Sequence, residues 1–89
     1  AYVGTAADDV LENLVELYYL SESQEIMLVD PSGILKNYRV YNSLGQIVQE
    51  GNIEAKVQGV DLRALPAGHY AFETISHLGE SCVEQFVKQ

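Results

Sequence analysis

The stretch LRALPAGHY, residues 62–70, decides the fold of this chain. Leu65 stands five residues before Tyr70, and Pro66 and Gly68 lie between them. Proline presets φ and glycine permits a tight reversal, so the stretch predicts a corner that leads into a strand. In antiparallel β-sandwiches a tyrosine at such a corner buries its ring and hydrogen-bonds through its hydroxyl to backbone a few residues upstream. We therefore expect Tyr70 to anchor a two-sheet, all-β fold.

Strand and turn patterns flank this corner. Tyr38 and Val40 alternate with their neighbours, which is typical of a half-buried strand. Residues 42–45, NSLG, predict a turn, because Asn42 and Gly45 tolerate positive φ at low cost. We expect the partner strand to end at a break formed by Gly51 and Asn52. The expected strands from here onward cover residues 46–50, 56–62, 69–77 and 81–88.

The first 30 residues permit two interpretations. Residues 13–20 and 25–29 are rich in strand formers and flank a polar turn at 21–24, which predicts a β-hairpin. Apolar residues at helical spacing also fit a helix over residues 8–20, but the hairpin is favoured. Residues 1–12 are either a linker or contain an extra strand at 2–4. The whole pattern predicts an Ig-like antiparallel β-sandwich of about seven strands with Greek-key connections.

Length and charge restrict the class of protein. At 89 residues, the chain is expected to form a single domain over residues 1–89. It has 13 acidic and 5 basic side chains, a net charge of −8, which argues against binding nucleic acid or an anionic membrane surface. No apolar run approaches the roughly 20 residues that span a bilayer, so no direct membrane insertion is expected. Because the chain begins at Ala1 without an initiator methionine, we expect a domain excised from a longer protein.

The sequence offers no set of residues for catalysis or metal binding. His69 and His77 are eight residues apart, too far along a strand to share one metal ion. Cys82 alternates with Glu84 and Phe86, so burial is the expected role of its thiol. The serines lack a nucleophile motif, and the acidic residues lack the spacing of a calcium loop. We predict a protein that is not an enzyme and uses no cofactor or metal.

Three motifs together resemble one known family. Residues 38–48, YRVYNSLGQIV, are similar to its strand–turn–strand motif v-x-v-[YF]-[DN]-x-x-G-[KRQ]-x-[VL]. Residues 60–70 match its D-L-x-x-L-P-x-G-x-Y corner, and EQFVKQ at 84–89 resembles its closing K-F-[VI]-[KV] strand. In this order, over about residues 25–89, they resemble the C-terminal sorting domain of type IX secretion substrates in Bacteroidetes. The family's Y-P-N-P stretch is absent.

The resemblance implies a targeting function. It implies that the parent protein reaches the periplasm through an N-terminal signal peptide. The folded domain would then be recognised by the outer-membrane translocon and its shuttle proteins, and delivered to the cell surface, the outer membrane or the extracellular space. In many family members a surface sortase removes the domain, whereas components of the machinery retain it as an anchor.

The resemblance also implies roles for individual residues. The residues expected to define the fold are Asn42, Gly45, Leu62, Leu65, Pro66, Gly68 and Tyr70. The candidates for recognition by the translocon, by strand addition at an edge or by surface contact, are Phe86, Val87 and Lys88.

An alternative function is an Ig-like carbohydrate- or protein-binding module of a surface protein. An unpaired edge strand could support a homodimer.

The charge is unevenly distributed along the chain. The first 30 residues hold seven acidic side chains and no lysine or arginine, whereas the remainder holds six acidic and five basic ones. The part that resembles the family is therefore almost neutral, and the acidity belongs to the other end.

Overall fold

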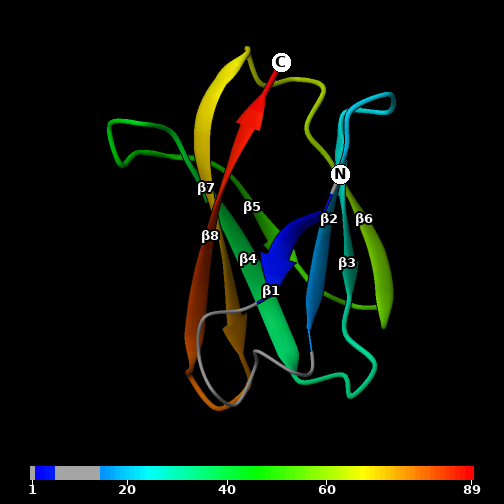
Figure 1. Cartoon of the computed structure of the whole chain (residues 1–89). Coiled ribbons are helices and arrows are strands. Elements are labelled where there is room, and N and C mark those ends of the chain that lie inside the picture. Colours follow the sequence, from blue (N-terminus) through cyan, green and yellow to red (C-terminus); the bar gives the residue numbers. More distant parts are fainter. Residues whose placement is uncertain (1, 6–14) are drawn as a thin grey trace.

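A computed structural model describes residues 2–5 and 15–89, and in these ranges the chain forms eight β-strands and no helix (Figure 1). The sequence patterns produce the strands largely where they were predicted, and residues 2–4 fall in a further one. The strands are β1 (Tyr2–Thr5), β2 (Glu16–Leu20), β3 (Glu25–Val29), β4 (Leu35–Tyr41), β5 (Ile47–Asn52), β6 (Val57–Asp61), β7 (Gly68–Ser76) and β8 (Ser81–Lys88).

The strands form two antiparallel sheets that face each other (Figure 1). One sheet has the order β1-β2-β3-β6 and the other has the order β5-β4-β7-β8. The chain crosses from β3 to β4, returns from β5 to β6 beside β3, and crosses again from β6 to β7 beside β4. These crossings interlock the two sheets, as in Greek-key sandwiches. The all-β, Ig-like sandwich predicted from the sequence is confirmed.

Alternation along the strands builds the core between the sheets. In β7, Tyr70, Phe72 and Thr74 are buried, whereas the residues between them are partly exposed. The rings of Tyr38 and Phe72 stack with their centroids 5.3 Å apart. Burying side chains of this size contributes about 1.5–3 kcal/mol each to folding. The buried hydrophobic residues are Val15, Leu17, Tyr19, Ile26, Leu28, Leu35, Tyr38, Val40, Ile53, Val60, Leu62, Leu65, Tyr70, Phe72, Cys82 and Phe86.

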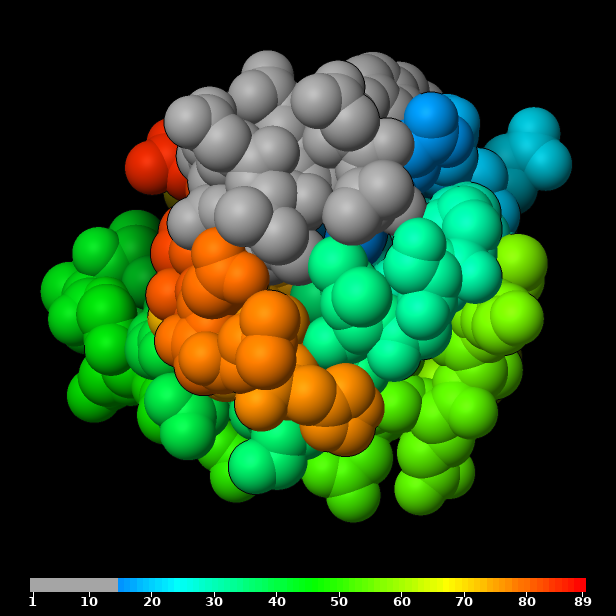
Figure 2. Space-filling model, turned by 90° about the horizontal axis from the view of Figure 1, so that it is seen from below, coloured from blue at the N-terminus to red at the C-terminus, as the bar shows by residue number. Residues whose placement is uncertain are grey.

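At one end of the sandwich the β3–β4, β5–β6 and β7–β8 connections lie next to one another (Figure 2), and hydrogen bonds join them. The Asp30 carboxylate is buried and accepts hydrogen bonds from the backbone N–H groups of Ile34 and Leu35 at 3.2 and 3.0 Å. The N–H of Asp30 donates to the carbonyl of Lys56, and the N–H of His77 donates to the carbonyl of Ile34. The β3–β4, β5–β6 and β7–β8 connections are therefore joined at this end, and the β2–β3 turn, the β4–β5 turn and the corner lie at the opposite end (Figure 1).

The favoured hairpin is confirmed by the pairing of β2 with β3, so one alternative and one expectation need correction. A helix over residues 8–20 is wrong for residues 16–20, which form β2 and pair along their length with β3; residues 8–14 lie outside the described residues. The expected break at Gly51 and Asn52 is also wrong, because both belong to β5. The ring of Tyr38 covers Gly51, and a Cβ at Gly51 would lie 2.9 Å from it. Glycine here makes room for an aromatic ring and does not end the strand.

Candidate functional site

The corner at residues 62–70 is built around the hydroxyl of Tyr70. This hydroxyl donates a hydrogen bond of 2.5 Å to the carbonyl of Pro66, four residues upstream. The N–H of Leu65 donates to the carbonyl of Leu62 at 3.0 Å, which tightens the start of the corner. Leu62 and Leu65 are buried in the core and Gly68 opens β7. The residues expected from the sequence to define the corner therefore lie together in it, and their role in defining the fold stays a prediction.

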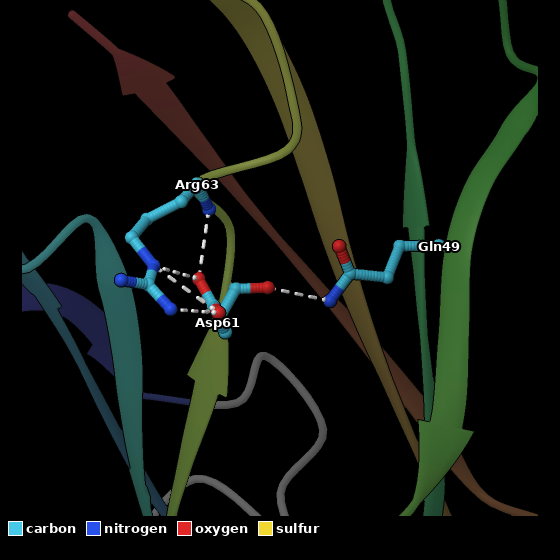
Figure 3. Close-up of polar contacts among 3 residues, drawn as sticks. All are labelled: Gln49, Asp61 and Arg63. Atoms are coloured by element: carbon cyan, nitrogen blue, oxygen red, sulfur yellow. Dashed lines mark hydrogen bonds and ion pairs between the residues drawn. The ribbon is translucent and has the colours of Figure 1, made fainter.

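Asp61 and Arg63 brace the segment that enters this corner (Figure 3). The Asp61 carboxylate accepts hydrogen bonds from the backbone N–H of Arg63 at 2.9 Å and from its guanidinium at 3.0–3.3 Å. These bonds lower the pKa of Asp61. Gln49 of β5 donates through Nε2 to the backbone carbonyl of Asp61 at 2.9 Å, so the side chain connects the edge strands of the two sheets. The contacts are exposed, and their role is to shape the entry to the corner.

Asn42 organises the β4–β5 turn. Its Oδ1 accepts hydrogen bonds from the N–H groups of Leu44 and Gln46 at 2.9 and 3.0 Å, and its Nδ2 donates to Gln46 Oε1. Gly45 has a φ of +80°, and its N–H donates to the carbonyl of Asn42. A residue with a Cβ is disfavoured at this φ. The spacing of Asn42 and Gly45 is thus explained by the geometry of the turn.

The closing strand, β8, lies at the edge of its sheet and alternates between buried and exposed side chains. Phe86 is buried, with ring centroids 5.8 Å from Tyr19 and 5.6 Å from Tyr70. Lys88 is only 5% exposed, and its Nζ donates a 2.6 Å hydrogen bond to the carbonyl of Leu65. Val87 points the other way and is 48% exposed.

This alternation divides the three residues expected to contact the translocon. The side chains of Phe86 and Lys88 hold β8 against the core and the corner, and that of Val87 is available at the surface. The period of two already places Lys88 on the same face as Cys82 and Phe86, and this signal could have shown its burial. A role for the three residues in recognition stays a prediction.

A groove of about 560 Å³ lies where the turn, the start of β7 and the end of β8 meet. Five residues singled out from the sequence line it: Asn42, Gly45, Tyr70, Phe86 and Val87. The remaining lining residues are Tyr41, Ser43, His69, Ala71 and Gln85. Tyr41 belongs to the quoted strand–turn–strand motif, but no local pattern brought these five residues together. Strand register does so, because His69 pairs with Val87, and Ala71 pairs with both Gln85 and Tyr41. Leu62, Leu65, Pro66, Gly68 and Lys88 do not line the groove and lie in the corner and behind it.

The polar side chains next to the groove already bond to each other. Tyr41 donates its hydroxyl to Glu73 Oε1 at 2.7 Å, and this bond raises the pKa of Tyr41. Arg39 Nη1 lies 4.0 Å from the same carboxylate oxygen. Across residues 15–89 no three His, Cys, Asp or Glu side chains come together as metal ligands, and no described helix could span a membrane. His69 lines the groove, whereas His77 lies at the other end of β7, and Cys82 is buried.

Comparisons with known proteins agree with this geometry. The solved structure of a DUF3244 family protein with an immunoglobulin-like β-sandwich fold, from Bacteroides vulgatus, is similar with a TM-score of 0.82. The two are 17% identical, and the match covers 99% of this chain and 97% of that one, which shows the fold alone. No curated protein matches the chain. The model of the secretion system C-terminal sorting domain matches residues 20–89, the range that contains the turn, the corner and the closing strand. The chain therefore belongs to the family of secretion system C-terminal sorting domains.

Proposed function

We propose that this domain directs its parent protein through the type IX outer-membrane translocon to the cell surface. The observation that carries the proposal is the family match over residues 20–89. The structure adds support, since three motif segments far apart in the sequence surround one groove at one end of a sheet. A domain with this arrangement acts by being recognised, and we propose the translocon and its shuttle proteins as the partners that recognise it.

The end of β8 is the part of the domain that we propose is presented to these partners. β8 is the last strand of its sheet and contacts β1 of the other sheet, and edge strands offer backbone groups for pairing with another chain. Val87 supplies an exposed apolar side chain at the same place. At the surface, a sortase would then remove the domain or the domain would stay attached as an anchor, and delivery at the surface precedes either outcome.

Export of a reporter tests the proposal. Residues 1–89 are fused to the C-terminus of a periplasmic reporter in a bacterium with a type IX system, and the fraction of reporter accessible to protease on intact cells is measured. We expect accessibility that is lost in a strain without the translocon. A reporter that stays in the periplasm while its fused domain is folded would contradict the sorting function and favour an Ig-like binding module.

Deletion of the chain end alone is a weaker test. Removing residues 86–89 takes Phe86 out of the core and removes the bond between Lys88 and Leu65, so the domain would lose stability as well as its signal. Unchanged surface delivery after this deletion would nevertheless contradict the role given to the end of β8. A substitution that leaves the core intact separates recognition from folding, and Val87 provides one.

A further inference from the structure

The groove is uncharged in a strongly acidic domain. None of its ten lining residues is an Asp, Glu, Lys or Arg, although the whole chain has a net charge of −8. Desolvating a charge without a partner is costly, so a charged ligand group would have no counter-ion among these lining residues. An uncharged occupant fits this lining.

Three of the six polar side chains in the lining already hydrogen-bond within the domain. The hydroxyls of Tyr41 and Tyr70 donate to Glu73 and Pro66, and the side-chain amide of Asn42 is used within its own turn. Tyr70 keeps its ring in the core, so Tyr41 is the tyrosine on the same face of the sheet as Ala71 and Val87. The other three polar side chains of the lining, Ser43, His69 and Gln85, can pair with the backbone groups of a peptide. A segment of protein therefore fits this lining.

Apolar side chains extend the groove onto the surface around it. Val87 at the lip is 48% exposed, and Leu44, in the turn between two lining residues, is 81% exposed. Ile47 pairs with Tyr41, at the same end of the sheet, and is also exposed. Exposed apolar side chains gathered in this way are typical of a surface that a protein partner covers.

We propose that the groove between the β4–β5 turn and the end of β8 receives an uncharged, aliphatic segment of a protein of the sorting machinery. This inference rests on the proposed sorting function and adds the chemistry of the partner. The occupant covers Val87 and Ala71, and Tyr41 lies in the same lining, whereas the Tyr70 ring is buried in the core on the other face of β7. Because the lining carries no charge, a charge of either sign introduced at its lip weakens binding.

Val83 provides a matched control for Val87. Both residues lie on the exposed side of β8, with 47% and 48% of their surface accessible, but Val83 does not line the groove. The variants are Val87→Lys and Val87→Glu, with Val83→Lys and Val83→Glu as controls, in the reporter fusion described above. Thermal melting of each isolated domain verifies that all four variants fold.

Both Val87 variants are expected to lower the surface-accessible fraction by about tenfold or more, because burying an unpaired charge costs more than one decade of affinity. Both Val83 variants should stay within about twofold of the original. Equal delivery by folded Val87 and Val83 variants would overturn the proposal, as would a loss with only one sign of charge, which indicates a charged occupant. Failure of the unsubstituted fusion to reach the surface would instead refute the sorting function itself.

A photo-crosslinking residue at position 87 identifies the occupant directly. In cells with the translocon, mass spectrometry of the crosslinked peptide is expected to show a segment of a translocon or shuttle protein rich in aliphatic residues and free of charged ones. The same residue at position 83 should not crosslink that segment. A crosslinked segment rich in lysine, arginine or carboxylates would overturn the proposal even if position 87 proved to be at the interface.

Discussion

Tyr70 permits the corner to be tested one group at a time. Its buried ring packs against Phe86, with the centroids 5.6 Å apart, and its hydroxyl donates to the carbonyl of Pro66. Tyr70→Phe removes the hydrogen bond and keeps the ring. Tyr70→Ala removes both. The difference between the two variants therefore separates the contribution of the bond from that of packing.

The magnitudes follow from this geometry. Losing the hydroxyl leaves a partly buried carbonyl without its donor, which lowers the free energy of unfolding by about 1–2 kcal/mol. Truncating the buried ring to alanine costs about 3–5 kcal/mol. A domain of this size has a total stability of about 4–13 kcal/mol. Since 1 kcal/mol corresponds to about 4–8 °C in a small domain, Tyr70→Phe lowers Tm by about 4–16 °C and Tyr70→Ala by at least about 12 °C.

Far-UV circular dichroism during heating measures these shifts, since the chain has no tryptophan to report unfolding by fluorescence. Leu78→Ala is the control, because the side chain of Leu78 is 84% exposed and its truncation changes stability by about 0.5 kcal/mol or less. Two results together would refute the argument that the corner stabilises this fold: a Tm of Tyr70→Phe equal to that of the control, and a free energy of unfolding of Tyr70→Ala lowered by less than about 1 kcal/mol.

Three further variants test other contacts. Lys88→Ala removes the donor to Leu65 and the buried stem, and urea unfolding should show a loss of about 1–3 kcal/mol; an unchanged midpoint would contradict a structural role for Lys88. Gly45→Ala should cost about 1 kcal/mol in the same assay because φ is +80° with no steric contact, and a neutral result would mean that the turn relaxes. Burial raises the pKa of Glu84, so its charged form opposes folding and stability falls as pH rises above the unfolded-state pKa. Glu84→Gln should therefore be the more stable protein at pH 7 and equal the original below about pH 4, and a variant that is less stable at pH 7 would contradict this sign.

Local patterns determined most of the strands. The bounds of β3 and β8 agree with the residues predicted for them, because alternation of apolar and polar residues and the chemistry of the flanking turns are properties of adjacent residues. The ordered motifs are likewise a property of the sequence, and the family model matches the region that contains them. The prediction that β5 ends before Gly51 was wrong. Glycine often breaks a strand, but here it makes room for the Tyr38 ring on the neighbouring strand.

The candidate site depended on contacts between segments that the sequence separates. The sequence motif predicted the same recognition role for Phe86, Val87 and Lys88. The fold instead buries the side chains of Phe86 and Lys88 and exposes that of Val87. The ammonium of Lys88 finds its acceptor 23 residues away, at the corner. Such a partner is invisible to a local pattern.

The sequence by itself determined that this protein is an acidic β-sandwich with a tyrosine corner and the motifs of a sorting domain. Only the tertiary structure decided that the β4–β5 turn and the end of β8 share an uncharged groove, and that Val87 faces it. The physical reason is the separation along the chain of the residues that determine each feature. Turn geometry and strand periodicity are settled by neighbouring residues, whereas a groove is formed by the register of three strands and the packing that holds them together.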